Sequence, residues 1–200
     1  MKKDLFGLVG PWDSFTCSPS KPWMDFSKEW GASAGDLIAN FAGSGLFIGQ
    51  QLLWKEQRFT LKYSFHQTKY ADYRPDLYGK NFFQQMIKDY NGQTYWLSAN
   101  LKSFWKESSF LPDWLNLAVG YGVDGLTGAV ENETVYDGRE FPVFERNRQF
   151  YFSLDADLTR IKTRSEFLKN LFKVIGFIKI PFPALEYNTK GEFQFHAFYF

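Results

Sequence analysis

The sequence has few of the side chains from which metal and redox sites are built. Its 200 residues include one cysteine, Cys17, and two histidines, His66 and His196. A single cysteine excludes an internal disulfide and a multi-cysteine metal centre, and neither histidine has a carboxylate or cysteine at the spacing of a metal motif. No glycine-rich loop of the phosphate-binding type follows a predicted strand. We therefore expect no metal site and no cofactor.

The chain also has little net charge. Its formal net charge is +1 and its pI is about 7.7. Proteins that bind nucleic acid usually present a strong basic field, which this balance does not provide. The composition therefore disfavours a nucleic-acid partner.

A secretory leader is not apparent at the start of the sequence. Met1–Lys3 is basic, but the apolar stretch that follows, Asp4–Trp12, is short and is interrupted by Gly7, Gly10 and Pro11. The sequence therefore predicts no signal peptide, and an exported protein would need a leader from upstream sequence.

Aromatic residues are abundant. They make up 20% of the chain, with 23 Phe and 11 Tyr. Such a fraction suits either a bulky protein core or a lipid-facing surface with aromatic rims, and composition does not choose between the two.

A helix is predicted over Ala32–Trp54, where apolar residues recur at helical spacing. Asp36 and Asn40 interrupt the run of about 20 apolar residues that a membrane-spanning helix needs, so we expect a helix packed on protein or lying at an interface. Gly43 and Gly49 would let another backbone come close. Asp36 and Asn40 lie four residues apart on one face, where a structural capping role is favoured over catalysis.

Six extended segments follow this helix. In four of them apolar and polar residues alternate strictly, as in strands that bury one face. These four are Arg58–His66, Thr94–Phe104, Trp114–Leu126 and Gln149–Thr159. The other two are Lys179–Asn188, in which Pro181 and Pro183 predict an edge strand or an irregular connection, and Glu192–Phe200. A short helix is predicted around Phe82–Tyr90.

The alternating strands match the length of membrane-spanning β-strands. Their apolar faces are continuous, and their opposite faces carry Lys, Asn, Ser, Asp, Thr and Gly, which suits a small wet lumen. The predicted fold is therefore mainly β with a helical N-terminal portion, in an antiparallel outer-membrane-type β-barrel or barrel-like sheet. Six strands fall short of the roughly eight that a single-chain barrel needs, so further strands, a partner chain or a water-soluble periplasmic sheet remain open.

We expect residues 1–200 to form a single domain, because no polar linker divides them. Residues 1–57 are predicted to contain an irregular segment and the first helix, and residues 58–200 the antiparallel sheet. A basic amphipathic helix is predicted within Lys162–Ile178, near 163–177. Such a helix either lies on an anionic membrane surface or covers the sheet.

A catalytic grouping is conceivable on the polar strand faces. Ser64 and His66 share one face of the first strand, and Asp155 lies with Asp157 on one face of another. A serine, a histidine and a carboxylate in contact could activate a nucleophile, as in small outer-membrane enzymes that hydrolyse or transfer lipid A acyl chains. Polar residues on a lumen face are also normal without catalysis, so a protein that is not an enzyme is favoured and the lipid-modifying enzyme is the alternative.

Several motifs resemble one family of envelope proteins. The sequence of Phe26–Gly31, of Gly35–Asn40 and of the glycines Gly43 and Gly49 is similar to that of the YfiM-like family of predicted periplasmic lipoproteins. Further similar stretches are Leu52–Glu56, Tyr70–Gly79, Asn91–Trp96 and Asp157–Ile161, so the resemblance extends over most of residues 26–200. The resemblance implies an envelope protein of a Gram-negative bacterium and assigns it no activity. Together with the predicted strands, it leads us to expect a structural or accessory protein in the outer membrane or periplasm, in contact with membrane lipid and an envelope protein partner. The chain departs from this family in lacking the lipoprotein signal.

Overall fold

A computed structural model describes residues 34–128, 132, 135, 136, 138–140 and 142–200. The chain divides into two compact units, Met1–Ile48 and Gly49–Phe200. Within the first unit the described residues are helical and belong to α1, Ala34–Trp54, whose last turns belong to the second unit. The helix predicted over Ala32–Trp54 is thus present. The irregular segment predicted before it lies outside the described residues.

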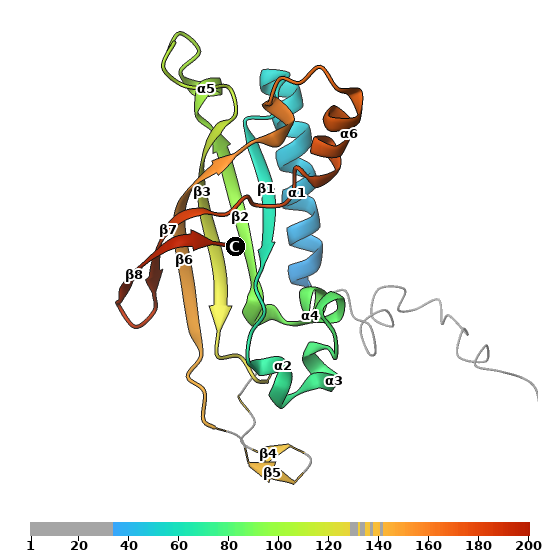
Figure 1. The fold of residues 1–200 in the computed structure, drawn as a ribbon, viewed down its shortest axis with the longest axis vertical. Helices are drawn as coiled ribbons and strands as arrows, with labels where there is room; N and C mark the ends of the chain where they lie inside the picture. Colours follow the sequence, from blue (N-terminus) through green and yellow to red (C-terminus); the bar gives the residue numbers. More distant parts are fainter. Residues whose placement is uncertain (1–33, 129–131, 133–134, 137, 141) are drawn as a thin grey trace, which may run out of the picture. The chain divides into compact units, whose positions relative to one another are not determined.

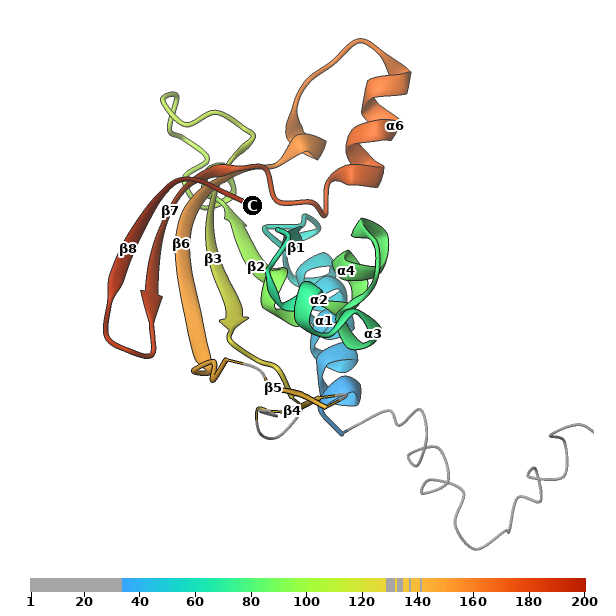
Figure 2. The same ribbon diagram turned by 60° about the horizontal axis from the view of Figure 1, so that its bottom comes forward.

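The second unit is built on one six-stranded antiparallel sheet, with the strands in the order β1-β2-β3-β6-β7-β8. Figure 1 and Figure 2 show that this sheet is strongly curved. Each strand pairs with the next sheet strand along the chain, and a short separate hairpin interrupts the path between β3 and β6. The strands are β1 Phe59–Phe65, β2 Gln93–Asn100, β3 Leu115–Asp124, β6 Asn147–Ala156, β7 Phe182–Asn188 and β8 Phe193–Tyr199, and the hairpin is β4 Val135–Tyr136 with β5 Arg139–Glu140.

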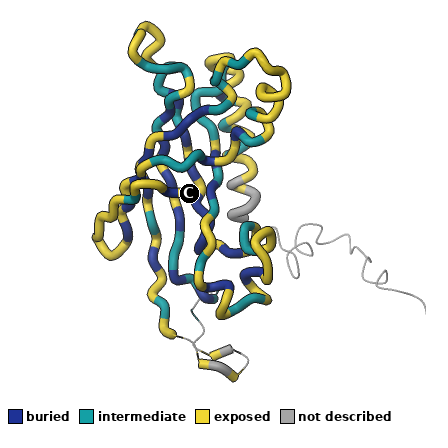
Figure 3. Tube along the Cα trace, in the orientation of Figure 1, coloured by how far each residue is buried: buried dark blue, intermediate teal, exposed yellow. Residues whose placement is uncertain are grey.

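The predicted antiparallel sheet is therefore confirmed, with its alternating faces. Along β3 and β6, buried residues alternate with residues that are half-buried or exposed, as Figure 3 shows. We call the face that carries the buried residues Trp96, Ala118 and Tyr151 the inner face, and the opposite one the outer face. The sheet does not close, because β1 and β8 remain at its two edges. Closure into a barrel is therefore not part of the observed fold.

The two predicted strands that end earliest relative to expectation are those of β2 and β6, and the cause is the same in both. At the end of β2, the side chain of Asn100 accepts a hydrogen bond from the backbone N–H of Ser103 at 3.0 Å. This contact starts a short helix, α5 Leu101–Phe104, inside the segment predicted as strand. After β6, Asp157 accepts from the N–H of Thr159 at 3.0 Å and starts the 3₁₀ turn η3, Leu158–Arg160. Short polar side chains that bond to nearby backbone compete with the strand ladder in this way.

Short helices connect β1 to β2 at one end of the sheet. They are α2 Tyr70–Tyr73, α3 Pro75–Tyr78, α4 Phe82–Lys88 and η2 Tyr90–Gly92. Hydrogen bonds tie them to the chain at the end of β3: Tyr70 donates to Asp124 at 2.8 Å, and Tyr78 donates to the carbonyl of Leu126 at 2.6 Å. The helix predicted at Phe82–Tyr90 is present but ends at Lys88, because Asp89 caps η2.

The predicted amphipathic helix is present as α6, Glu166–Ile175, on the connection between β6 and β7. It is shorter than the predicted range, since the Ser165 side chain caps its start by accepting from the N–H of Leu168. β7 lies between β6 and β8, so the prediction of an edge strand is wrong. The regular pairing of β7 with β6 nevertheless begins only at Ala184, after both prolines, as an irregular connection requires.

The last strand contains a shift that sets which side chains face outward. Its pairing with β7 changes register between Phe182 and Ala184. As a result His196 and Tyr199, three residues apart, both take part in the ring contacts of the inner face. The four phenylalanines of this segment are exposed, by 71% at Phe193, 68% at Phe195, 76% at Phe198 and 55% at Phe200.

Candidate functional site

The inner face of the sheet holds most of the buried polar groups. Strict alternation places one side chain in two on this face, and on β1, β2, β3 and β6 many of those positions are polar. Buried side chains there include Lys62, Ser64, Thr94, Ser98, Asn116, Ser153 and Asp155. A buried polar group needs a partner, so these residues form networks across the strands.

An ion pair lies at the centre of the first network. The Nζ of Lys62 on β1 is 2.7 Å from Oδ2 of Asp155 on β6, and both side chains are fully buried. Ser98 on β2 donates to the same carboxylate oxygen at 2.6 Å, and Lys62 also donates to the carbonyl of Ala156 at 2.7 Å. The other oxygen, Oδ1 of Asp155, has no hydrogen-bond partner in the described part of the chain.

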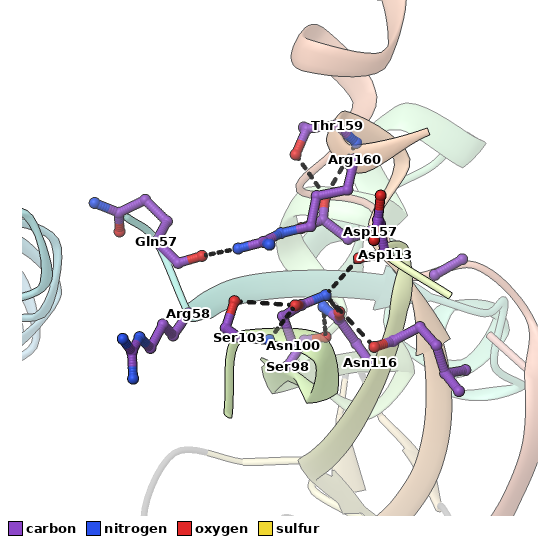
Figure 4. A network of polar contacts seen from close by, with 12 residues as sticks. Gln57, Arg58, Ser98, Asn100, Ser103, Asp113, Asn116, Asp157, Thr159 and Arg160 are labelled. Carbon is purple, nitrogen blue, oxygen red and sulfur yellow. Dashed lines mark hydrogen bonds and ion pairs between the residues drawn. The ribbon is translucent and has the colours of Figure 1, made fainter. Parts of the chain in front are cut away.

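Amide side chains extend this network toward one end of the sheet. Asn116 donates to Ser98 at 2.9 Å, and Asn100 donates to Asn116 at 2.8 Å. Asn100 also donates to the backbone carbonyl of Asp113 at 2.8 Å and accepts from Ser103, so it is the hub of the contacts in Figure 4. These bonds hold the ends of β2 and β3 together.

A second lysine enters the inner face from outside the strands. Lys179 precedes β7, and its Nζ donates to Ser153 at 3.2 Å and to the carbonyls of Leu154 and Ile180, each at 2.9 Å. It also lies 4.8 Å from the ring of Trp96, a cation–π contact. Burial lowers the pKa of Lys179 to about 8, although Asp155 nearby acts in the opposite direction.

The backbone around Lys179 pairs with the free edge of β1. Tyr63 donates its N–H to the carbonyl of Phe177 at 2.8 Å, and Lys179 donates its N–H to the carbonyl of Tyr63 at 2.9 Å. The chain that enters β7 thus lies alongside β1 for one parallel bridge. This bridge covers part of one sheet edge.

Aromatic rings and a histidine fill the rest of the inner face. His196 on β8 lies 2.7 Å from the Oε2 of Glu186 on β7, and Gln149 donates to the other oxygen of Glu186 at 2.9 Å. The rings of Tyr151 and Tyr199 lie 4.3 Å apart, and burial is the main cause that raises the pKa of both hydroxyls. Both phenols therefore stay neutral at physiological pH and act as hydrogen-bonding groups.

The four residues suggested for catalysis do not form a catalytic group. Ser64 accepts a hydrogen bond from the indole of Trp96 at 2.9 Å, and Asp155 is bound by Lys62. Asp157 caps η3 and pairs with Arg160 at 3.2 Å. His66 is exposed, and its ring contacts Tyr199 at 5.9 Å between centroids. No hydrogen bond or ion pair joins any two of Ser64, His66, Asp155 and Asp157, all of which are described, so the predicted Ser/His/Asp grouping is not assembled.

The residues that do interact were partly accessible to sequence reasoning. Lys62 and Asp155 each lie on the polar side of an alternating strand. The sequence therefore allowed a charged pair to be predicted on one face of the sheet. Lys179 belongs to no strand, and its inward position depends on how the chain enters β7. Glu186 and His196 are brought together by the pairing of β7 with β8. That pairing contains a register shift, which makes it hard to predict from the sequence.

The residues of the helix motif all lie in α1. Asn40 is exposed, and the side chain of Asp36 lies outside the described part of the structure. Gly43 is half-buried. A Cβ at Gly49 would meet no described atom within 4 Å, so the close backbone approach expected there is not seen.

Neither a metal centre nor a membrane-spanning helix is found among the described residues. No three His, Cys, Asp or Glu side chains among them are grouped so that they could hold a metal ion. None of the described helices combines the length and the apolar character that crossing a membrane requires.

Comparison with known proteins gives no match to this chain among protein-family models, curated proteins or solved structures. The resemblance to the YfiM-like family therefore stays a prediction from the quoted motifs.

Proposed function

We propose that this chain is an outer-membrane protein of a Gram-negative cell envelope, with a structural or accessory role and the outer face of its sheet in contact with lipid. The observation that carries this proposal is the inverted burial of the sheet. Apolar side chains are exposed on the outer face, whereas lysines and carboxylates are buried on the inner face.

The outer face is apolar along the middle of the sheet. Val119 on β3 is 51% exposed, Phe152 on β6 is 50% exposed and Leu185 on β7 is 44% exposed. These three residues lie side by side in the register of the sheet. Soluble proteins rarely expose a contiguous apolar patch that extends across several strands. Acyl chains would cover this face at no cost in hydrogen bonds, because its polar backbone groups are paired within the sheet.

The inner face has the character of a lumen. Ala118 and Ser153, the sequence neighbours of Val119 and Phe152, are 0% and 3% exposed. In outer-membrane β-proteins the inward positions are polar and the outward positions apolar, the reverse of a soluble sheet. The contacts of Lys62, Asp155 and Lys179 support this arrangement, since each would be very costly on a lipid-facing side.

A barrel belongs to this proposal and requires more strands than the sheet has. Membrane barrels contain at least about eight strands, and a free edge in lipid leaves backbone groups unpaired. The sheet provides six. Closure would need pairing at the edge of β8 and at the part of the β1 edge that the bridge beside Tyr63 leaves open, through further sequence of this protein or a partner in the envelope.

Fractionation of the native protein between soluble and outer-membrane pools tests the proposal. We expect the protein in the outer-membrane pool, and we expect its gel mobility to change on heating if a closed barrel forms in the cell. Recovery in the soluble periplasmic pool without detergent would contradict the proposal. Recovery in the membrane pool with a gel mobility that does not change on heating would support the lipid contact and contradict the closed barrel.

The structure gives the lipid-modifying enzyme no specific support, because Ser64, His66 and Asp155 are engaged with other partners. Substitution of His66 by Ala is its direct test, since His66 is exposed and its loss should leave the fold intact. An envelope lipid profile that changes in this variant would revive the enzymatic alternative.

A further inference from the structure

The helix α6 carries an apolar stripe that the described part of the chain does not bury. None of its residues is buried, although Phe167, Leu171 and Val174 recur at helical spacing. Phe167 is 72% exposed and Val174 is 68% exposed. A helix that covered the sheet would bury this stripe, so its exposure favours the membrane-surface role of the two considered from the sequence.

Basic side chains surround a cavity beside the same helix. The cavity has a volume of about 320 Å³ and lies between η3, the following loop and α6. Four cationic side chains, those of Arg160, Lys162, Lys169 and Lys173, line it together with two threonines and three apolar residues, and no carboxylate is among the lining residues. We call this cavity the basic cleft.

The cations of the basic cleft are available for a ligand. Lys162 pairs with Asp113 at 2.8 Å and Lys169 pairs with Glu166, but these lysine side chains are 89% and 45% exposed. Exposed ion pairs contribute little stability, so an anion could replace the carboxylates at low cost. Lys173 has no ion pair within the described residues.

The cleft has a fixed side. Asp157 caps η3 and holds Arg160, whose guanidinium also donates to the backbone carbonyl of Gln57 at 2.7 Å (Figure 4). At the other end, a Cβ at Gly176 would lie 3.0 Å from the Cγ2 of Thr159, so the glycine lets the end of α6 pack against η3. These contacts hold the Arg160 side chain in place and set the backbone of α6 beside η3 before any ligand arrives.

We propose that the basic cleft binds the phosphate of an anionic lipid while the apolar stripe of α6 enters the acyl layer of the same membrane. Lysine, arginine and threonine side chains are the groups that bind phosphate oxygens. A basic amphipathic helix lies at a membrane interface with its apolar face toward the acyl chains. A free phosphate ion would use the cleft but not the stripe, so the combination favours a lipid. This inference rests on the membrane location proposed above.

Native mass spectrometry of the full chain in a neutral detergent tests the proposal. The probes are phosphatidylglycerol, phosphatidylcholine and inorganic phosphate at matched concentrations. We expect phosphatidylglycerol to be retained about tenfold more tightly than phosphatidylcholine. The headgroup of phosphatidylglycerol has a net negative charge, whereas that of phosphatidylcholine has none. The double variant Lys169→Gln/Lys173→Gln should lose that preference. The control variant Lys88→Gln/Lys190→Gln removes the same charge at exposed lysines away from the cleft and should keep it.

The apolar stripe is tested by a second double variant, Phe167→Ser/Val174→Ser. We expect it to weaken the retention of phosphatidylglycerol several-fold and to leave the binding of inorganic phosphate unchanged. Both positions are highly exposed, so the fold should persist, which circular dichroism checks.

Three results would overturn the proposal. They are equal retention of the two lipids, equal losses in the cleft and control variants, and displacement of phosphatidylglycerol by equimolar inorganic phosphate. The last would identify a site for free phosphate. A soluble native protein that still shows a lipid preference dependent on Lys169 and Lys173 would refute the membrane location alone. A membrane-bound protein without that preference would refute the basic cleft alone.

Discussion

The ammonium of Lys62 on β1 lies 2.7 Å from the carboxylate of Asp155 on β6, although β2 and β3 separate these strands in the sheet. The two residues meet because the sheet curves around its inner face (Figure 2). The pair therefore reports directly on the curvature, since a flat sheet would hold the two strands too far apart for contact.

Substitution of Asp155 by Ala should lower the free energy of unfolding by about 3–5 kcal/mol, because it leaves the Lys62 ammonium buried without a counter-ion. Chemical denaturation of the purified protein measures this loss. The double variant Lys62→Met/Asp155→Val should recover most of it, since no charge is then buried. Glu166→Ala is the control, because it breaks an exposed pair with Lys169 and should change stability by less than about 1 kcal/mol. A loss in Asp155→Ala as small as in this control would show that the pair is not buried.

The stability of the protein should rise as the pH increases from about 8 toward the usual lysine pKa of 10.5, owing to Lys179. Burial lowers the pKa of Lys179 to about 8 in the folded protein, so in this window the unfolded chain binds the proton and the folded chain does not. The gain is at most about 3 kcal/mol. Denaturation across this range, compared between the native protein and Lys179→Met, measures it. An equal pH dependence in both proteins would exclude Lys179 as the cause.

The substitution Gly120→Ala should destabilise the protein by about 1–3 kcal/mol through overpacking. Gly120 lies opposite Trp96 in the sheet, and a Cβ there would approach the indole Cε3 to 2.6 Å. The indole is 1% exposed, so it has little room to move. Gly49→Ala is the matched control, since a Cβ at this helical position meets no described atom within 4 Å. There the substitution should stabilise by up to about 1 kcal/mol. Similar effects at both sites, measured by denaturation, would contradict the tight packing of Trp96.

A fluorophore attached to the outer face should be quenched by brominated phospholipid. The labelling site is Phe152→Cys in a Cys17→Ser background, and Ser109→Cys in an exposed loop is the control. After reconstitution we expect lipid quenching at position 152 and quenching by aqueous iodide at position 109. The reverse pattern, or iodide quenching at both sites, would show that the outer face is in water.

The strands were largely predictable because alternation is a local property of the chain. All six extended segments become strands of one sheet. The errors lie at the ends of elements, as at Asn100 and Asp157, where a side chain bonds to backbone two or three residues ahead. In both cases the alternating pattern continues past the cap, so periodicity alone could not locate the end of the strand.

The polar contacts of the inner face were much less predictable. Ser64, His66 and Asp155 have the side chains that a catalytic group needs, and they lie on polar faces of their predicted strands. In the structure, however, each of them contacts a different residue. The position of a residue in an alternating strand determines which face of the sheet it lies on. It does not determine which residue of a distant strand it contacts. The position of Lys179 depended on the path of the chain after α6, for which the sequence contains no periodic signal.

The sequence by itself determined which segments are extended, which face of each is apolar, and that α6 is basic on one side and apolar on the other, because these properties depend on side chains a few residues apart. Only the tertiary structure decided that the described part of the chain leaves the apolar face uncovered, that the sheet curves far enough to join Lys62 with Asp155, and that η3 and α6 enclose the basic cleft. These features depend on strand order, register and chain crossings between residues distant in sequence, where small differences in packing energy select one arrangement from many.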